Sequence, residues 1–443
     1  MGLPATGVAD VRTARAGYLG WCRDADEGAR TEALRRLPAH HVRRASTSVH
    51  RKFVGGTMVP APRRPYARPM AEDRMRARAA GIPFDGEPGP WNALTDVPGI
   101  EVGYVTLVEG SDVRTGVTAI LPRGRAGVGD PCAAGWHALN GNGEMTGTVW
   151  LEETGSLAVP VLLTNTYAVG PVHRGAVEWL GRNCRGMAPE WLLPVVTETW
   201  DAHLNDIHGT AVRPRHATEA IEAAASGPLA EGAVGGGTGM RCYGFKGGSG
   251  TASRVVAYGA DRYTVGAFVQ ANFGAKRELT VAGVPVGREL PDPDALAASE
   301  TGASRGTRPV PPGAGSIVVV LGTDAPLLPG ECKALARRVP LGLARTGTTG
   351  SHFSGDLFLA FSTANSGALN STFPHDEADA PYESLRFVPW GRMDRFYEAV
   401  VECVEEAVLN VLTGAAPMTG RDGNHVPALP LARTRELLGA RAV

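Results

Sequence analysis

The stretch GSIVVVLGTDAPL (residues 315–327) is the most apolar segment of the chain and contains a run of β-branched residues. Val and Ile favour strands, and a strand without polar alternation is typical of one that is buried on both faces. The preceding stretch, PDPDALAASETGASRGTRPVPPGAG (291–315), is rich in Pro, Gly, Ala and Ser and predicts a structureless linker of about 25 residues. Linkers of that length inside a compact domain are uncommon, and they are usually functional or disordered. The sequence therefore predicts an abrupt change from linker to buried strand at Gly315-Ser316.

Strands and helices alternate along the rest of the chain. Apolar alternation and β-branched residues predict further strands at 92–107, 116–122, 191–200, 262–273 and 356–362. Helical spacing predicts helices at 216–226, 331–339 and 395–412, the last with Asp394 as its N-cap. Because many strands are consecutive, the pattern favours layered sheets covered by helices over a simple Rossmann fold.

Size and charge limit the possible classes of protein. The chain has 443 residues, 43% of them hydrophobic, which suffices for one large domain or two. Its net charge of −1 argues against binding to nucleic acid or to a membrane surface as a whole. Charge is uneven, since up to Met70 there are 13 Lys and Arg against five acids. We expect residues 1–72 to be a disordered basic extension or to precede the natural start, for which Met70 is a candidate.

No targeting or membrane segment is recognisable in the sequence. No apolar run approaches the length of a membrane span, and the basic head lacks the apolar core of a secretory signal. The six cysteines contain no C-x-x-C pair; they are Cys22, Cys132, Cys184, Cys242, Cys332 and Cys403. This usage predicts buried, reduced thiols and a cytoplasmic location.

Three motifs suggest chemistry but lack the context that it requires. GGGTGMRCYGFKGGSGTASR (235–254) is rich in glycine, yet it contains neither GxxxxGK[ST] nor GxGxxG, so tight turns and close backbone packing are favoured over a phosphate site. GASRG (302–306) matches the G-x-S-x-G of a nucleophile elbow, but its serine follows a linker instead of a strand. His203 and His208, with Asp206 between them, form only a weak ligand pattern, and we predict no metal site.

Gly315-Ser316 offers a different chemistry. A serine hydroxyl needs a base, and the α-amino group of the same residue can supply one when the serine is N-terminal. That amine titrates near pH 8 in peptides. A cut after Gly315 would create it, and a residue without Cβ lets the backbone strain as the hydroxyl attacks its carbonyl. Gly-Ser occurs five times in the chain, including Gly350-Ser351, so this pattern alone does not select the bond.

Nine segments, in one order, resemble a known family over roughly residues 80–440. They are GIPFDGEPGPWNALTDVPGIEVG (81–103), NGNGEMTG (140–147), LTNT (163–166), GGGTGM (235–240), GFKGGSGTASRVV (244–256), VQAN (269–272), AGVPVG (282–287), GSIVVVLGTD (315–324) and SGDLFLAFSTAN (354–365). The chain resembles the L-aminopeptidase/D-esterase (DmpA-like) family of self-processing β-aminopeptidases, peptidase family S58.

The resemblance implies a fold and a cut. The fold is an αββα four-layer sandwich, similar to the N-terminal-nucleophile hydrolases but with distinct connectivity. We expect residues 73–443 to form it as a single catalytic domain. Cleavage between Gly315 and Ser316 would yield an α chain that ends at residue 315 and a β chain of residues 316–443.

The resemblance also implies roles for individual residues around the cut. Ser316 matches the nucleophile, and its free amine is a candidate base. Ser354 and Asp356 match the family's second serine and its acidic partner, which we expect to orient Ser316 by hydrogen bonding. The alternative for this pair is a turn before the strand at 357. Asn272 matches the residue that helps to hold the oxyanion, a donor typically worth a factor of about 10²–10³, with turn formation at a strand end as the alternative.

A second group of matched residues is expected to bind the substrate. Glu198 matches an acidic residue thought to bind the substrate's free ammonium, with a structural ion pair as the alternative. Trp200 lies where a relative carries Tyr. Because an indole N–H donates but cannot accept a proton, we expect Trp200 only to wall the pocket. Asn142 and Glu144 are expected to line the cleft, with turn formation as the alternative.

Together these residues predict a self-cleaving serine aminopeptidase that works through an acyl-enzyme on Ser316 and without a cofactor. Its substrates would be short peptides, amino-acid amides or esters with a free amine, including β- or D-amino acids. The resemblance implies a homo-oligomer, a tetramer of processed αβ units, with no nucleic-acid or membrane partner. Two alternatives remain open. One is an acyltransferase like the ornithine acetyltransferases, which self-cleave before Thr. The other is a non-catalytic binding protein that uses its basic head on nucleic acid.

Overall fold

Two sheets form the centre of the protein, whose computed structural model describes residues 74–184, 193–301, 313–371 and 382–440. The smaller sheet contains, in spatial order, β1 (Glu101–Glu109), β2 (Val113–Leu121), β5 (Val161–Asn165) and β6 (Val195–Thr199). The larger sheet contains, in spatial order, β4 (Ser156–Leu157), β3 (Cys132–Gly141), β12 (Ser354–Ser362), β11 (Gly315–Thr323), β10 (Asp261–Asn272) and β9 (Gly248–Tyr258). Two small hairpins pair β7 (Arg241–Cys242) with β8 (Phe245–Lys246) and β13 (Met418–Thr419) with β14 (His425–Val426).

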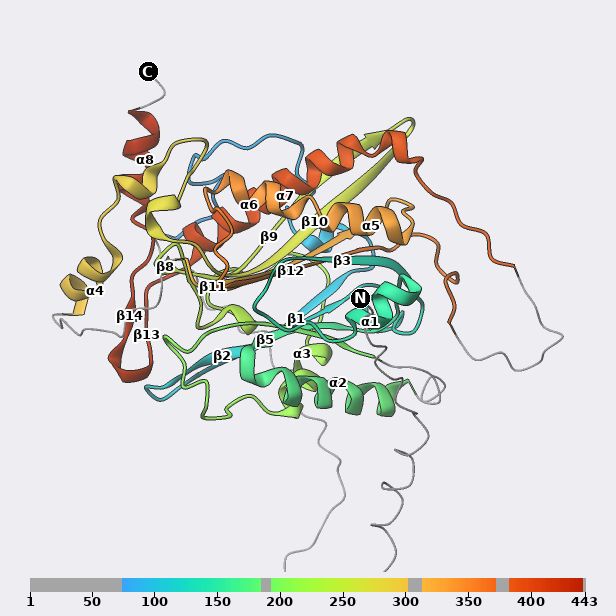
Figure 1. Cartoon of the computed structure of the whole chain (residues 1–443), viewed down its shortest axis with the longest axis horizontal. Helices are drawn as coiled ribbons and strands as arrows, with labels where there is room; N and C mark the ends of the chain where they lie inside the picture. The colour runs from blue at the N-terminus through green and yellow to red at the C-terminus, as the bar shows by residue number, and fades with distance from the viewer. Residues whose placement is uncertain (1–73, 185–192, 302–312, 372–381, 441–443) are drawn as a thin grey trace, which may run out of the picture. The chain divides into compact units, whose positions relative to one another are not determined.

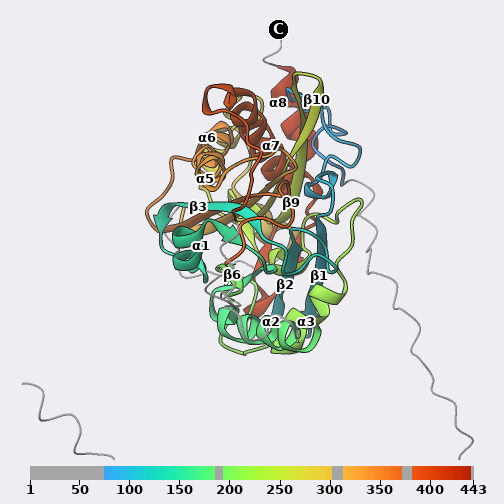
Figure 2. The ribbon, with the colours of Figure 1, turned by 90° about the vertical axis from the view of Figure 1, so that its right-hand side faces the viewer.

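Helices cover the outer faces of the two sheets. The helices of the described segments are α1 (Thr148–Thr154), α2 (Val169–Asn183), α3 (Pro214–Glu222), α4 (Pro293–Thr301), α5 (Pro329–Ala336), α6 (Val339–Arg345), α7 (Asp394–Gly414) and α8 (Leu431–Gly439), of which α4 contacts the β14 hairpin instead. Helices α5, α6 and α7 lie over the larger sheet, whereas α2 and α3 lie over the smaller one (Figure 1). The view from the side shows the same order of layers (Figure 2). The arrangement confirms the expected αββα sandwich.

Strand β11 contacts a different hydrophobic core on each of its faces. Ile317, Val319 and Leu321 pack in the core beneath the helices, together with residues of α7. Val318 and Val320 pack in the core that the two sheets share. Every second side chain therefore enters the same core, as the pleat of a strand requires. This two-sided burial explains why the strand carries no polar alternation.

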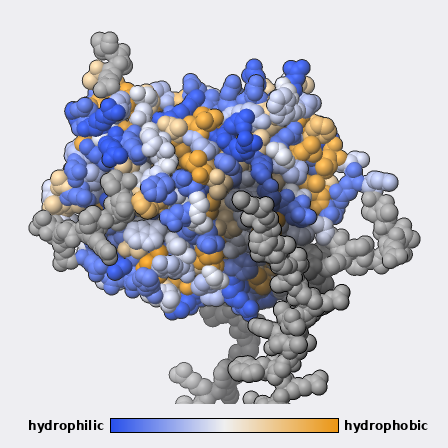
Figure 3. Space-filling model, in the orientation of Figure 1, coloured by the Kyte–Doolittle hydropathy of each residue, from blue (hydrophilic) through white to orange (hydrophobic). Residues whose placement is uncertain are grey.

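The sequence bears on both the hydropathy of the surface and the state of the cysteines. The face seen in Figure 3 is mostly hydrophilic, with scattered hydrophobic patches. Within the described ranges, no helix combines the length and the hydrophobicity that spanning a bilayer requires. The five described cysteines are free thiols, and all except the half-buried Cys184 are buried, in line with the prediction. Cys22 and the predicted extension 1–72 lie outside the described residues.

Most of the predicted strands are confirmed, with ends that differ by a few residues. The segment 92–107 is strand only from Glu101, where β1 begins. Before that, Leu94–Asp96 form a 3₁₀ turn, because the Asp96 carboxylate accepts the backbone N–H groups of Trp91 and Ala93. This local hydrogen bonding competes with strand pairing.

Two predictions about helices are wrong. The linker 291–315 is not structureless, since α4 occupies Pro293–Thr301. Asp292 accepts the N–H of Asp294 at 2.9 Å, and a proline then opens the helix, which is a typical start signal. Asp394 is not an N-cap; it lies in the first turn of α7, and Met393 holds the cap position. The GASRG motif (302–306) lies outside the described residues.

Candidate active site

Ser316 lies at the start of β11, between two neighbouring strands of the larger sheet. On one side β10 runs antiparallel and places Asn272 opposite Ser316. On the other side β12 runs parallel and places Gly355 opposite it. The serine is buried, with 3% of its surface exposed, and its hydroxyl donates to the Gly315 carbonyl oxygen at 2.7 Å. The hydroxyl of Ser316 is thus held against the peptide bond that would be cut.

Gly315 is a position where only glycine fits. A Cβ built on it would lie 1.8 Å from the backbone oxygen of Asn272. The backbones of β10 and β11 therefore leave no room for a side chain at the bond before Ser316. This close approach is the physical reason for a glycine there.

Ser354 and Asp356 lie within β12 and not in a turn before it, so that alternative is wrong. Ser354 stands opposite Gly315 and donates to the Asp356 carboxylate at 2.6 Å, and Asn140 donates to the other carboxylate oxygen at 2.9 Å. Burial raises the pKa of Asp356, while the hydrogen bonds from Ser354, Asn140 and the backbone N–H of Ile317 lower it. Among the described contacts, neither Ser354 nor Asp356 bonds the Ser316 hydroxyl. The pair lies on β12, the strand next to the nucleophile. Ser354 is opposite Gly315 and Asp356 is opposite Ile317, the residues before and after Ser316.

Asn272 has its side-chain amide fixed at both ends. Its Oδ1 accepts the backbone N–H of Arg241 at 2.8 Å, and its Nδ2 donates to the Trp200 carbonyl at 2.7 Å. An amide nitrogen carries two protons, and only one is used in these contacts. The other forms no hydrogen bond among the described contacts. Trp200 contributes its carbonyl here, and its side chain is half-buried.

Glu198 is a buried carboxylate, 2% exposed, near the same end of the strands. It accepts the backbone N–H of Glu144 at 3.0 Å and a short hydrogen bond from the Thr166 hydroxyl. A Cβ on Gly143 would lie 3.2 Å from Glu198 Oε1 and 3.4 Å from the Cα of Gly355, which places the carboxylate beside the partner of Ser316.

No cation of the described segments neutralises the charge of Glu198. Burial raises the pKa of Glu198, and the hydrogen bonds from Thr166 and the Glu144 N–H only partly oppose this shift. Among the described residues, no Lys, Arg or His forms an ion pair with it. The structural ion pair, the alternative to an ammonium site, therefore has no partner in the described part of the chain.

The NGNGEMTG segment crosses directly over β12. A Cβ on Gly355 would lie 2.2 Å from the Asn142 carbonyl oxygen, so segment and strand pack backbone to backbone. Asn142 is exposed, and its side chain donates to the Phe353 carbonyl at 2.9 Å. Glu144 is exposed as well, and its backbone N–H, not its carboxylate, supports Glu198. Both residues lie at the site, and their described contacts hold the NGNGEMTG segment against Phe353 and Glu198.

Sequence reasoning missed Thr166 and Asn140, which hold Glu198 and Asp356. Both lie in segments that resemble the family, LTNT and NGNGEMTG, but only the contacts across strands show which residue holds which carboxylate. The glycine-rich segment packs tightly, as predicted. A Cβ on Gly237 would lie 2.4 Å from the Ser249 nitrogen, and one on Gly250 would lie 2.3 Å from the Ala407 oxygen.

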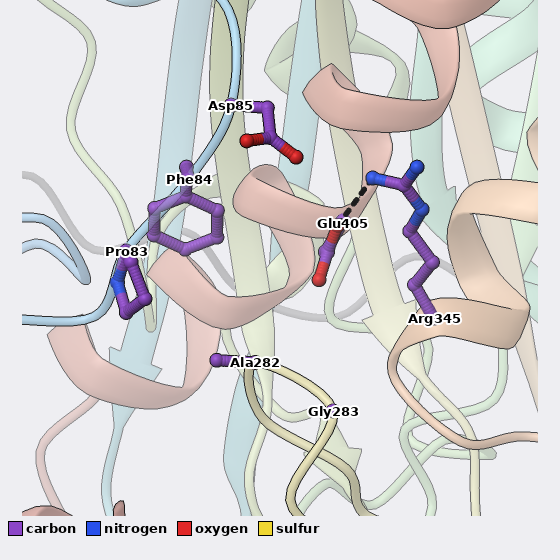
Figure 4. Close-up of a pocket in the computed structure, with 7 residues that line it drawn as sticks. All are labelled: Pro83, Phe84, Asp85, Ala282, Gly283, Arg345 and Glu405. Atoms are coloured by element: carbon purple, nitrogen blue, oxygen red, sulfur yellow. Dashed lines mark hydrogen bonds and ion pairs between the residues drawn. The ribbon is translucent and has the colours of Figure 1, made fainter. Parts of the chain in front are cut away.

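The molecule also has a surface pocket of about 450 Å³ between the N-terminal segment and α7 (Figure 4). It is lined by Pro83, Phe84, Asp85, Ala282, Gly283, Arg345 and Glu405, and an ion pair of 3.1 Å joins the last two side chains from α6 and α7. None of the predicted site residues lines this pocket.

Comparison with known proteins gives consistent matches. Residues 92–426 match peptidase family S58. The chain is 48% identical over 378 residues to the β-peptidyl aminopeptidase BapA of Sphingosinicella microcystinivorans, which covers 82% of this chain and 91% of that protein. It is 40% identical over 381 residues to the β-peptidyl aminopeptidase BapA of Sphingosinicella xenopeptidilytica, which covers 83% and 91%.

The fold matches solved structures as well. One is the L-aminopeptidase D-Ala-esterase/amidase of Ochrobactrum anthropi, described as a prototype of the serine aminopeptidases and a new variant of the Ntn hydrolase fold. It shows a TM-score of 0.74 and 43% identity, and it covers 83% of this chain and 99% of that one. A Burkholderia sp. β-aminopeptidase shows a TM-score of 0.73 with the same identity and coverage. The chain therefore belongs to peptidase family S58, as a serine aminopeptidase with a variant of the Ntn hydrolase fold.

Proposed function

We propose that the chain cuts its own Gly315–Ser316 bond and then removes the N-terminal residue from short peptides, amides and esters. The observation that carries the proposal is the position of Ser316. Its hydroxyl lies 2.7 Å from the Gly315 carbonyl oxygen, and Asn272 stands opposite on β10. In the cut, the Ser316 oxygen attacks the Gly315 carbonyl carbon, the hydroxyl proton passes to the peptide nitrogen, and the C–N bond breaks to leave an ester and the free Ser316 amine. Water then hydrolyses the ester, which releases the Gly315 carboxylate and restores the Ser316 hydroxyl.

The processed enzyme would reuse the same groups on a substrate. The free amine of Ser316 takes the hydroxyl proton as the oxygen attacks the substrate carbonyl. The unused amide proton of Asn272 stabilises the oxyanion, and Ser354 with Asp356 orients the new N-terminus from the adjacent strand. The uncompensated carboxylate of Glu198 binds the substrate's ammonium. The proton on the Ser316 amine passes to the leaving amine, and water then releases the acyl group as the acid.

The substrate class follows from the relatives. Two of them are β-peptidyl aminopeptidases, which supports an N-terminal β-amino acid as substrate. Another is an L-aminopeptidase and a D-Ala esterase and amidase, which supports amides and esters. A panel of p-nitroanilides and amides with β-, L- and D-residues would rank these classes by kcat/KM.

The intact mass of the purified protein, measured under denaturing conditions, tests the cut. We expect two fragments, one beginning at Ser316, and loss of both cleavage and amidase activity in Ser316→Ala, which should remain a single chain of 46.3 kDa. Ser351→Ala is the matched control, because Ser351 follows a glycine too and should leave both properties intact. Cleavage or amidase activity in Ser316→Ala would overturn the proposal. The tetrameric state and the cytoplasmic location are further proposals, to be tested by light scattering and by cell fractionation.

A further inference from the structure

Arg241 is attached to the predicted oxyanion donor through its backbone. It begins β7, directly after the GGGTGM turn, and its N–H donates to Asn272 Oδ1 at 2.8 Å. Asn272 is in turn the register partner of Ser316 on β10. Asn272 therefore lies between the backbone of Arg241 and Ser316.

The guanidinium of Arg241 lacks a close anionic partner. Its side chain is 28% exposed, and its Nε is buried without a hydrogen bond. In the described part of the chain, the only carboxylate within 4.0 Å is that of Asp294 on α4, which is at 4.0 Å from Nη2 and is 84% exposed. Arg254 provides the contrast, because it pairs with Glu402 at 3.1 Å and with Glu406 at 2.8 Å. A largely buried cation is normally paired in this way, so Arg241 has unused capacity for an anion.

His203 lies beside this guanidinium and carries no charge. Its Nδ1 is 3.5 Å from Arg241 Nη1. Burial, with a smaller effect of the Arg241 charge, lowers the pKa of His203 to about 3, so the ring is neutral at working pH. The backbone of Arg241 bonds one end of the Asn272 amide. His203 lies three residues after Trp200, whose carbonyl bonds the other end.

Glu198 and Arg241 are anchored next to Ser316 through different neighbours. The Glu198 carboxylate lies near Gly355, the partner of Ser316 on β12, whereas the backbone N–H of Arg241 bonds Asn272, the partner of Ser316 on β10. A dipeptide carries the complementary charges, with its ammonium before the bond to be cut and its carboxylate after it. Arg presents a planar fork of donors that suits a carboxylate.

We propose that the Arg241 guanidinium, with the neutral ring of His203 beside it, binds the free α-carboxylate of the residue that leaves when a dipeptide is hydrolysed. This inference rests on the proposed function and specifies its substrate class. The binding holds the leaving residue by its terminus and makes a free dipeptide a better substrate than its amide.

Kinetics with three substrates that share one N-terminal residue test the inference. These are a dipeptide, its C-terminal amide and a p-nitroanilide, and only the dipeptide carries the carboxylate. In the processed enzyme with Arg241→Met, we expect kcat/KM for the dipeptide to fall by about 10- to 100-fold, mainly through KM. The other two substrates should change less than about threefold, since the variant keeps the backbone N–H that holds Asn272. Arg277→Met, which removes an exposed guanidinium elsewhere, should leave all three unchanged.

Other outcomes have distinct meanings. An equal loss on all three substrates would overturn the inference and assign Arg241 a role in supporting Asn272. An unchanged dipeptide rate would overturn it as well. Intact mass shows whether the variant is processed, and if Arg241→Met fails to mature, Arg241→Gln repeats the comparison with a polar side chain. If the wild type hydrolyses none of the three, the proposed function fails instead.

Discussion

At the scale of single residues, two backbones approach each other closely at the bond proposed to be cut. Because a Cβ on residue 315 would lie 1.8 Å from the Asn272 oxygen, Gly315→Ala must push the start of β11 away from β10. Overpacking of this kind costs about 1–3 kcal/mol, which corresponds to cleavage slower by about one to two orders of magnitude. Intact mass followed over time measures the rate.

Gly330→Ala is the matched control for this prediction. Gly330 lies near the start of α5, where an added Cβ meets no atom within 4 Å, so this variant should mature as the wild type does. Cleavage of Gly315→Ala at the rate of the control would show that the close packing at Gly315 plays no part in maturation.

The same scale shows what the sequence could predict about the site. Gly-Ser recurs along the chain, and only the resemblance selected Ser316, Asn272 and Glu198 together. The structure brings all three to one end of the sheets. It also corrects the context of Ser354, which lies in a strand because it pairs with Gly315 on β11, while its hydroxyl bonds Asp356 along β12. Contacts such as Thr166 with Glu198 depend on how strands pair, which a single sequence does not reveal.

At the scale of elements, the end of β5 supports the end of β6. Thr166 follows β5 directly, and its hydroxyl donates to Glu198 on β6. That hydrogen bond lowers the pKa of Glu198, so Thr166→Val should raise it further. Since only the carboxylate form binds an ammonium, the loss of kcat/KM on acidification should begin at a higher pH. We expect KM at the acid end of the profile to rise about five- to tenfold, with little change at pH 8.

The pH profile of kcat/KM for an amide substrate checks this prediction. Thr154→Val is a suitable control, because its hydroxyl donates to the Trp150 carbonyl within α1 and not to a site residue. A profile that stays in place in Thr166→Val would mean that Glu198 does not set the acid limb.

Elements were predictable where burial alone determines them. Strand β11 is apolar on both faces and α7 has a long helical stripe, so both are recognisable without partners. The segment 92–107 and the linker 291–315 depend on local hydrogen bonds of Asp96 and Asp292, which override composition. The Asp-Pro pair at 292–293 is a helix start that a closer look at capping residues could have recognised.

At the scale of the whole molecule, the proposed cut divides the larger sheet between two chains. Strands β11 and β12 would belong to the β chain, yet they lie between β10 and β3 of the α chain. The αββα order of layers was predictable only from the resemblance to the family, because the pattern of strands and helices predicts no more than stacked sheets. A cut at residue 315 leaves every one of these ladders in place, so the two chains should stay together as one folded unit.

Buried ion pairs would also join the two chains after processing. Glu406 on α7 pairs with Arg254 and Arg78, both at 2.8 Å, and Glu406 and Arg254 are each 1% exposed. Breaking a buried pair costs about 3–5 kcal/mol, so Glu406→Gln should lower the unfolding midpoint of the processed protein in guanidinium chloride. Glu405→Gln, which removes only the partly exposed pair with Arg345, should cost about 1 kcal/mol or less. Both variants must be compared at one protein concentration, because unfolding separates the chains. Equal midpoints would mean that the Glu406 cluster does not hold the chains together.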